Sequence, residues 1–160
     1  MKNQILKLLE DDAKLTSKQI AIMLDVPQNE VESLISEMES NGTILGYRTV
    51  VDWEKTDKES VSAMIDVKLT PQRGKGYDRV AEKIYNYPEV KSVYLMSGAY
   101  DLSVLIEGKT MKEVAFFVSQ KLAPIDEVIS TATHFVLHKY KDTGVLHDPA
   151  LDIDERGNCN

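Results

Sequence analysis

The chain has 160 residues, and 19 Lys and Arg against 26 Asp and Glu give a net charge of −7 and a pI near 5.0. Its apolar runs, such as residues 115–118, are far shorter than the ~20 residues of a membrane helix. The single cysteine, Cys159, excludes an internal disulfide. We therefore expect a cytoplasmic protein with no membrane partner. Its acidity argues against a generic nucleic-acid binder, because phosphate neutralisation needs clustered Lys and Arg.

Three short helices are predicted in the first 42 residues. Thr16 and Gln19 form a capping-box pattern at the start of the second helix. Pro27 ends that helix, because it drives the preceding residue out of the helical region. The third helix ends at Asn41-Gly42, a common C-terminal signal. The helices carry apolar residues at helical spacing: Ile5, Leu6, Leu8 and Leu9, then Ile20, Ala21, Met23 and Leu24, then Val31, Leu34, Ile35 and Met38.

Residues 43–51 are rich in β-forming side chains around Gly46, which predicts an extended hairpin after the third helix. Three helices followed by a β-hairpin form the winged helix-turn-helix arrangement, whose third helix enters the major groove of DNA. We assign residues 1–52 to this domain. The polar segment 53–60 lacks core periodicity and is interpreted as a linker.

Residues 61–141 alternate between strand and helix. Val61, Ala63, Ile65, Val67 and Leu69 share one face of the first strand. A helix over about residues 77–85, strands at 91–97 and 100–107, a helix from 111 to 122 and a strand from about 129 to 140 follow. This β-α-β-β-α-β order is typical of a ferredoxin-like fold, an antiparallel sheet with two helices on one face.

Two further expectations concern the edges of this domain. The other face of the sheet needs a cover, and self-association is the usual one, because uncovered apolar sheet is prone to aggregate. The segment 142–160 is acidic and poor in large apolar residues, so we expect a disordered tail.

Two segments carry a family resemblance. Residues 15–21 (LTSKQIA) and 41–47 (NGTILGY) resemble the DNA-binding half of Lrp/AsnC (feast/famine) transcriptional regulators. Residues 96–101 (MSGAYD) resemble that family's Gly-x-Tyr-Asp signature, and they fall in the region where the family has its effector-binding domain. The resemblance covers residue 3 to about residue 141. It implies an α+β chain, an N-terminal winged helix-turn-helix followed by a ferredoxin-like effector-binding domain.

The resemblance also implies a function. We expect a sequence-specific transcriptional regulator that binds double-stranded DNA and responds to a small effector, most often an amino acid. The chain would form a homodimer through its sheet and assemble further into higher oligomers.

The third helix departs from the family pattern. The family usually has adjacent basic residues there, whereas this chain has four glutamates and no Lys or Arg between Gln28 and Asn41. Carboxylates near the phosphates repel DNA, although amides and hydroxyls can read base edges. The helix is therefore either a reading helix or a solvated acidic face in a degenerate DNA-binding half. The candidate contacts are Gln28, Asn29, Ser33 and Ser36 to bases, and Lys18 and Arg48 to the backbone.

The resemblance places an amino-acid effector pocket around the turn at residues 97–101. Amides of Gly98 and Ala99 can bind a carboxylate, and Asp101 can pair with an ammonium. A purely structural interpretation is also open, with Gly98 supplying a positive φ and Asp101 acting as a turn residue. Thr131 and Thr133 are ligand-binding hydroxyls or simply β-formers. The candidate effector-binding residues are Ser97, Gly98, Ala99, Tyr100, Asp101, Thr131 and Thr133.

No convergent set of titratable residues suggests an active site, so we expect no enzyme, no cofactor and no metal site. His134 and His138 would lie about 13 Å apart along a strand, too far to share a metal ion. Proteins resembling this family include sirohaem decarboxylases, which place basic and histidine side chains around their pocket. Residues 46–49 offer only Arg48, which disfavours that alternative.

Overall fold

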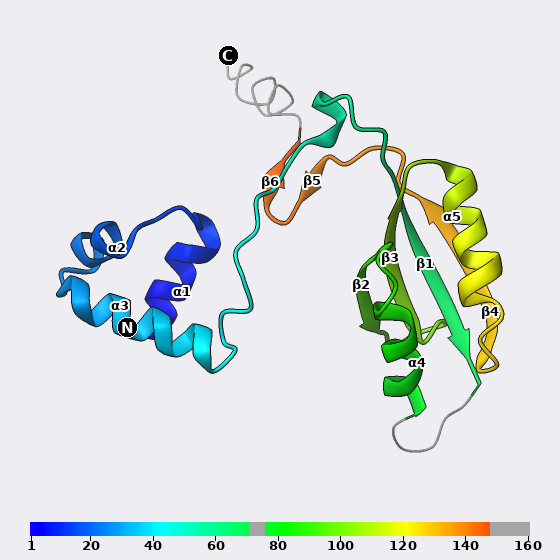
Figure 1. Cartoon of the computed structure of the whole chain (residues 1–160), viewed down its shortest axis with the longest axis horizontal. Helices are drawn as coiled ribbons and strands as arrows, with labels where there is room; N and C mark the ends of the chain where they lie inside the picture. Colours follow the sequence, from blue (N-terminus) through cyan, green and yellow to red (C-terminus); the bar gives the residue numbers. More distant parts are fainter. Residues whose placement is uncertain (71–75, 148–160) are drawn as a thin grey trace, which may run out of the picture. The chain divides into compact units, whose positions relative to one another are not determined.

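The computed structural model describes residues 1–70 and 76–147, and it divides into two compact units, the first from Met1 to Val50 and the second starting at Val51 (Figure 1). Within these residues, every helix is too short or too polar to reach across a bilayer. The first unit holds three helices: α1 (Lys2–Asp11), α2 (Ser17–Leu24) and α3 (Gln28–Ser40).

The predicted helix stripes are confirmed in the first unit, except at Met23 of α2, which is 58% exposed. The core consists of two buried residues from each helix: Ile5, Leu9, Ile20, Ala21, Val31 and Met38. The capping box is also confirmed, because the Gln19 N–H donates to Thr16 Oγ1 at 3.3 Å and the Thr16 N–H donates to Gln19 Oε1 at 2.9 Å. Asp25 ends α2 in the left-handed conformation, with φ of 53°. Residues 25–27 therefore form a three-residue turn between α2 and α3.

The predicted hairpin at residues 43–51 is wrong. All of these residues are described, and none of them lies in a strand. A β-hairpin needs a buried face, but only Ile44 packs on the helical core, while Leu45 is 95% exposed. The Tyr47 hydroxyl instead donates to Glu39 of α3 at 2.9 Å. β-Propensity without a packing surface did not produce a strand here.

The second unit contains a four-stranded antiparallel sheet in the order β2-β3-β1-β4. The pairing and the order fit the predicted ferredoxin-like pattern. Its elements are η1 (Trp53–Lys55), β1 (Val61–Leu69), α4 (Gly76–Tyr85), β2 (Val90–Leu95), β3 (Leu102–Gly108), α5 (Met111–Phe117), the π-helical turn η2 (Val118–Leu122), β4 (Val128–Phe135), β5 (Lys141–Asp142) and β6 (Val145–Leu146).

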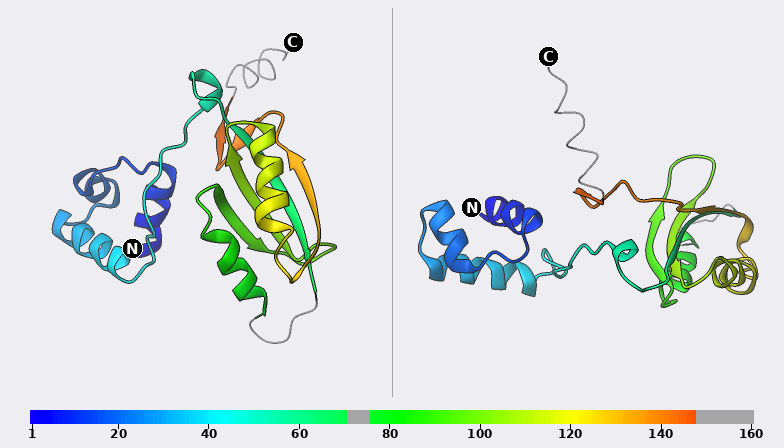
Figure 2. Two further views of the ribbon diagram at one scale, coloured as in Figure 1. Left: turned by 45° about the vertical axis from the view of Figure 1, so that its right-hand side comes forward. Right: turned by 90° about the horizontal axis from the view of Figure 1, so that it is seen from above.

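Helices α4 and α5 lie on the same face of the sheet (Figure 2). The core between them contains the predicted face of β1, with Ala63, Ile65, Val67 and Leu69 all buried. The opposite face carries Met64 of β1 and Tyr94 of β2, which are 46% and 57% exposed. This open apolar surface agrees with the expectation that the face takes a cover.

The structure differs from the prediction of a disordered tail beginning at residue 142. Strands β5 and β6 form a hairpin whose two turn residues, Thr143 and Gly144, have φ of 45° and 84°. Positive φ at both positions is the pattern of a type I′ turn. Strands of two residues leave no periodicity to detect, so the pattern was missed. The remainder of the predicted tail, residues 148–160 with Cys159, lies outside the described residues.

Candidate functional site

The candidate base-reading residues lie on the exposed side of α3. With 3.6 residues per turn, Asn29, Ser33 and Ser36 point away from the buried Val31 and Met38. All three side chains are exposed and uncharged. The helix therefore presents a row of amide and hydroxyl groups to solvent, which can donate to and accept from base edges.

Three of the four glutamates of α3 make contacts within the first unit. Glu32 accepts from Gln28 Nε2 at 2.7 Å, Glu37 pairs with Lys2 at 2.6 Å, and Glu39 accepts from the Tyr47 hydroxyl at 2.9 Å. Burial and the bond to Glu39 raise the pKa of Tyr47. Glu30 lies in the first turn, where the helix dipole favours a negative charge. The charge that argued against DNA binding is thus partly compensated, and the row of neutral side chains lies between the flanking carboxylates.

The structure brings some of the other candidate DNA contacts together. Lys18, in the first turn of α2, and Gln28, at the start of α3, line one open hollow around the turn at residues 25–27. One N–H of the Gln28 amide donates to Glu32, which leaves the second N–H and the carbonyl oxygen of this amide outside that bond. Arg48 is exposed in the irregular segment after α3.

The turn at residues 97–101 joins β2 to β3. Ser97, Gly98 and Ala99 are exposed, Tyr100 is half-buried, and Gly98 has φ of 153°, a conformation that favours glycine. The sequence-predicted positive φ at Gly98 is confirmed. The exposed amides of this turn are accessible to a ligand carboxylate.

Asp101 has a structural partner on β1. Its Oδ2 accepts from the Leu69 N–H at 2.8 Å and lies 3.2 Å from Lys68 Nζ. The bond from Leu69 lowers the pKa of Asp101, and Lys68 lowers it further. The Asp101 N–H also donates to the Val67 carbonyl at 3.0 Å. The side chain therefore fastens the turn to β1, through a contact that the sequence analysis does not predict.

Thr131 and Thr133 lie on β4, the strand that pairs with β1 on the side away from β3. Thr131 pairs with Val67 and Thr133 with Ile65, and both are half-buried. The turn contacts Val67 from the β3 side of β1, and Thr131 pairs with Val67 from the β4 side. Thr131 and the turn therefore lie at the same end of the sheet, separated by two strand spacings, or about 10 Å. Thr133 lies one pair further along β4.

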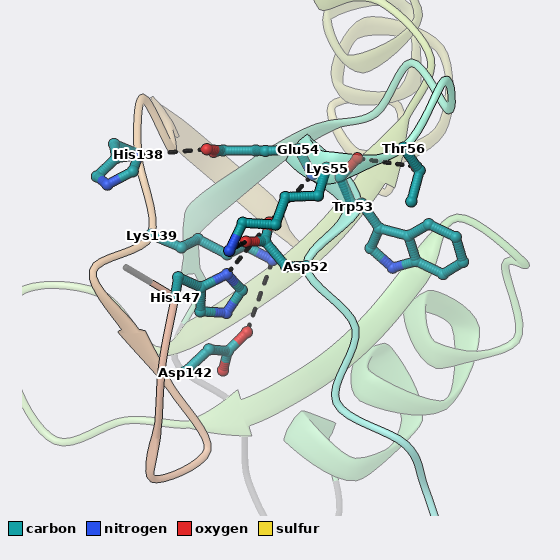
Figure 3. A network of polar contacts seen from close by, with 9 residues as sticks. All are labelled: Asp52, Trp53, Glu54, Lys55, Thr56, His138, Lys139, Asp142 and His147. Atoms are coloured by element: carbon teal, nitrogen blue, oxygen red, sulfur yellow. Dashed lines mark hydrogen bonds and ion pairs between the residues drawn. The ribbon is translucent and has the colours of Figure 1, made fainter. Parts of the chain in front are cut away.

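A polar network at the start of the second unit was not predicted from the sequence. Residues 52–56 face residues 138–147 (Figure 3). His147 Nδ1 lies 3.7 Å from Asp52 Oδ1, and His138 Nδ1 lies 3.4 Å from Glu54 Oε2. The Asp52 carboxylate also accepts from the Glu54 N–H at 3.2 Å. The network ties residues 52–56 to the segment that contains the C-terminal hairpin. No sequence motif indicates this contact, because its partners are about 90 residues apart in the chain.

The electrostatics of the network centre on Asp52. Burial acts to raise the pKa of Asp52, but the bonds from Lys55 and the Glu54 N–H, the charge of Lys55 and the neighbouring His147 lower it overall. The His147 side chain is only 8% exposed. This end of the second unit is therefore tied together by a carboxylate whose pKa lies below its ordinary value.

Known proteins match this chain along most of its length. A family model described as the Lrp/AsnC ligand binding domain matches residues 62–146. YugG of Bacillus subtilis, named an uncharacterized HTH-type transcriptional regulator, is 49% identical over 154 residues, 96% of this chain and 92% of that protein. FL11, an HTH-type transcriptional regulator of Pyrococcus horikoshii, is 30% identical over 143 residues, 89% of this chain and 91% of that protein.

A solved structure shares the fold. The complex of the transcriptional regulator NMB0573 of Neisseria meningitidis with L-Met superposes with a TM-score of 0.72 and 20% identity, over 90% of this chain and 93% of that one. The family match includes residues 142–146, in agreement with the hairpin observed there.

Proposed function

The chain belongs to the Lrp/AsnC family of transcriptional regulators, and from this premise we propose that it binds specific double-stranded DNA through its first unit and a small effector, an amino acid, through its second. We further propose that it works as a homodimer that assembles into higher oligomers. The observation that carries the DNA-binding part is the row of exposed, neutral hydrogen-bonding side chains on α3.

The first unit has the parts of a helix-turn-helix. Helices α2 and α3 are joined by a three-residue turn, which is the usual length for this motif. In such a unit, the N-terminal part of the second helix lies in the major groove. Asn29 and Ser33 occupy that part of α3, and Lys18 stands beside it to contact a phosphate. The proposal needs no strand in residues 43–51.

The first unit of each chain, which we call a DNA-binding head, offers few contacts to phosphates. Lys18 and Arg48 supply two, and each neutralised phosphate contributes about 0.9 to the slope of log affinity against log salt. A single head therefore binds weakly. Oligomers linking several heads raise the effective concentration of each head at its half-site, which supports binding by an acidic chain.

The effector part of the proposal rests on the second unit. Its family match is to a ligand-binding domain, and the neighbouring structure from Neisseria was solved with L-Met. The exposed turn at residues 97–99 and Thr131 lie at one end of the sheet. The open sheet face with Met64 and Tyr94 offers a second copy an apolar surface. An effector bound between subunits changes the relative stability of assemblies and hence the spacing of the DNA-binding heads.

The DNA-binding part is tested by titrating the purified chain onto the DNA upstream of its own gene at several salt concentrations. We expect a sequence-specific complex that Asn29→Ala weakens about tenfold, since a bidentate base contact is worth about 1–3 kcal/mol. Lys18→Ala should weaken binding to all sequences and reduce the salt slope by about 0.9.

Each variant has a matched control. Asn3→Ala removes an exposed amide from α1, and Lys14→Ala removes an exposed cation from the loop before α2. Neither should change the affinity as much as its counterpart. Absence of any sequence-specific complex at low salt would refute the proposal and favour a regulator whose DNA-binding half is degenerate.

A further inference from the structure

The chain is fixed again soon after it leaves the first unit. Within that unit, the Tyr47 hydroxyl donates to Glu39 of α3 at 2.9 Å. Within the second unit, Asp52 already faces His147. Residues 48–51, which we call the tether, lie between these two contacts, and the first three of them are exposed. The part of the chain that joins the two contacts is therefore short.

The contact that fixes the far end of the tether is built around a buried side chain. Residues 51–56 lie against residues 136–147, and we call this contact the latch (Figure 3). His147 Nδ1 lies 3.7 Å from Asp52 Oδ1, and the imidazole is only 8% exposed. The His147 N–H donates to the Tyr140 carbonyl at 3.0 Å, which holds this residue beside the C-terminal hairpin. The hairpin therefore positions the partner of Asp52.

The latch is also a contact that opens easily. Each of residues 51–60 is half-buried or exposed. Val51 and Trp53 share with Val136 the lining of a hollow of about 100 Å³, so the two sides of the latch are not closely packed. Segments that bury little apolar surface are among the first to separate from a folded domain. The latch can therefore open while the sheet stays folded.

Opening the latch lengthens the free part of the chain. With the latch closed, the five steps from Tyr47 to Asp52 span at most about 18 Å, since each residue adds up to about 3.6 Å. With the latch open, the chain is free as far as Val61, where β1 begins, and its reach rises to about 50 Å. The difference, about 30 Å, is close to one helical turn of DNA, about 34–36 Å.

The length of the free chain decides which DNA sites a dimer can occupy. Helix-turn-helix dimers bind two half-sites that lie one helical turn or a multiple of it apart. A second head has a high effective concentration at its half-site only when its connection matches the span, and almost none when the connection is too short. A short tether therefore restricts the spacing, and a long one tolerates several spacings.

We propose that the latch selects DNA sites by the spacing of their half-sites, and that Asp52 and His147 are the residues that determine this specificity. The closed latch confines the two DNA-binding heads of a dimer to one spacing, and the open latch lets them reach half-sites one turn farther apart. Both residues act through the length of the free chain and not through a contact with a base. The inference rests on the proposed function, since it requires two heads that bind DNA.

The state of the latch can be measured without DNA. Trp53 is the single tryptophan of the chain, it lies in the latch and it is 40% exposed. Asp52→Asn keeps an oxygen that can accept from the Glu54 N–H, but it removes the charge that faces His147. Asp52→Asn and His147→Ala should each shift the emission of Trp53 to the red and lower its anisotropy. Asp57→Asn, at an exposed position in the same segment, is the control and should change neither.

The selection of spacing is measured with DNA of altered length. The full-length chain is titrated onto the duplex upstream of its own gene, and onto the same duplex with 10 base pairs inserted between its half-sites. The natural chain and Asp57→Asn should lose more than about tenfold in affinity on the longer duplex, and Asp52→Asn less than about threefold. An insertion of 5 base pairs turns one half-site to the opposite side of the duplex, so all three proteins should lose affinity there.

A longer tether separates the role of the latch from any other effect of the substitutions. Nine Gly and Ser residues inserted after Thr49 equal the number that opening the latch frees, residues 52–60, and they leave Asp52 and His147 in place. This variant should tolerate the insertion of 10 base pairs as Asp52→Asn does, while the emission of Trp53 stays that of the natural chain.

Two results would overturn the inference. One is an unchanged Trp53 signal in both Asp52→Asn and His147→Ala, which would show that these residues do not hold the latch. The other is an equal loss of affinity on the longer duplex for the natural chain, Asp52→Asn and the chain with the longer tether. Absence of any complex between the natural chain and the unaltered duplex has a different meaning, because it refutes the proposed function and the selection of spacing with it.

Discussion

Asp101 and Glu89 lie at opposite ends of the same four-stranded sheet, and each carboxylate pairs with a lysine, Lys68 and Lys121 respectively. Asp101 also accepts from the Leu69 N–H, whereas Glu89 Oε2 is buried and has no hydrogen-bond partner among the described residues. The first carboxylate joins the turn at residues 97–101 to β1, and the second pairs with Lys121 of η2. The comparison teaches that the carboxylate of a family signature can be bound to the fold more tightly than one outside the signature.

The largest expected effect comes from Asp101→Ala. It leaves the Leu69 N–H without its acceptor, so the free energy of unfolding of the second unit should fall by about 1–3 kcal/mol. Urea denaturation at pH 7 measures this loss. Asp126→Ala, at an exposed position in the same unit, is the control and should change stability by less than about 0.5 kcal/mol. A small effect of Asp101→Ala would mean that the carboxylate is free for a ligand.

The same bond predicts a pH dependence. Because the pKa of Asp101 is lowered in the folded chain, its contribution to stability is fully present above the ordinary pKa of about 4. It is lost as the pH falls below that value and through the lowered pKa. The difference in urea midpoint between the natural chain and Asp101→Ala should therefore be constant between pH 5 and 7, both about one unit or more above the ordinary pKa, and shrink below it. A difference that persists unchanged below the lowered pKa would contradict the role of the ionised carboxylate.

Glu89→Gln should have a smaller effect on stability than Asp101→Ala. It weakens the pair with Lys121, whose side chain is about one-third exposed, and such pairs contribute about 0–1 kcal/mol. It also removes the ionised state of a buried oxygen for which the described residues give no hydrogen-bond partner, and this offsets part of the loss. We expect a change within about 1 kcal/mol in the same urea experiment. A loss as large as that of Asp101→Ala would show that Glu89 is structural.

Local patterns in the sequence were sufficient for most of the fold. The buried face of β1 follows from the alternation of Ala63, Ile65 and Val67, and the start of α2 follows from Thr16 and Gln19. Both depend on residues within one element, where periodicity and capping chemistry act. The segment 43–51 was mispredicted because a strand depends on a surface that the sequence does not reveal.

The sites were less predictable, because their contacts join residues far apart in the chain. The partner of Asp101 is an amide 32 residues away, and the partner of Glu89 is a lysine also 32 residues away. Contacts over such sequence separations follow neither helical nor strand periodicity, so a sequence pattern does not reveal them. The Gly-x-Tyr-Asp motif located the turn, but it could not tell whether the Asp101 carboxylate serves the fold or a ligand. The hollow beside Glu89, at the other end of the sheet, has no motif at all, since its lining comes from four separate segments.

The smallest expected effect extends the comparison to α3, where paired and unpaired carboxylates lie on one helix. Glu37 is neutralised by Lys2 at 2.6 Å, whereas the described residues give Glu30 no ion-pair partner. Glu30→Gln should raise DNA affinity about two- to threefold at low salt, since a single exposed charge is worth about 0.5 kcal/mol. Glu37→Gln is the matched variant and should raise it less, because Lys2 already compensates that charge.

Salt separates this effect from a change in base contacts. Repulsion between an exposed carboxylate and phosphates is screened within about 10 Å at 0.1 M salt, so the gain from Glu30→Gln should fall toward zero as salt rises. A direct contact to a base edge retains most of its value under the same conditions. If both variants raise affinity equally, the pair between Glu37 and Lys2 does not persist on DNA. In that case the carboxylates of both residues repel the phosphates. If only Glu30→Gln raises affinity, the contacts within the first unit are what allow an acidic helix to approach DNA.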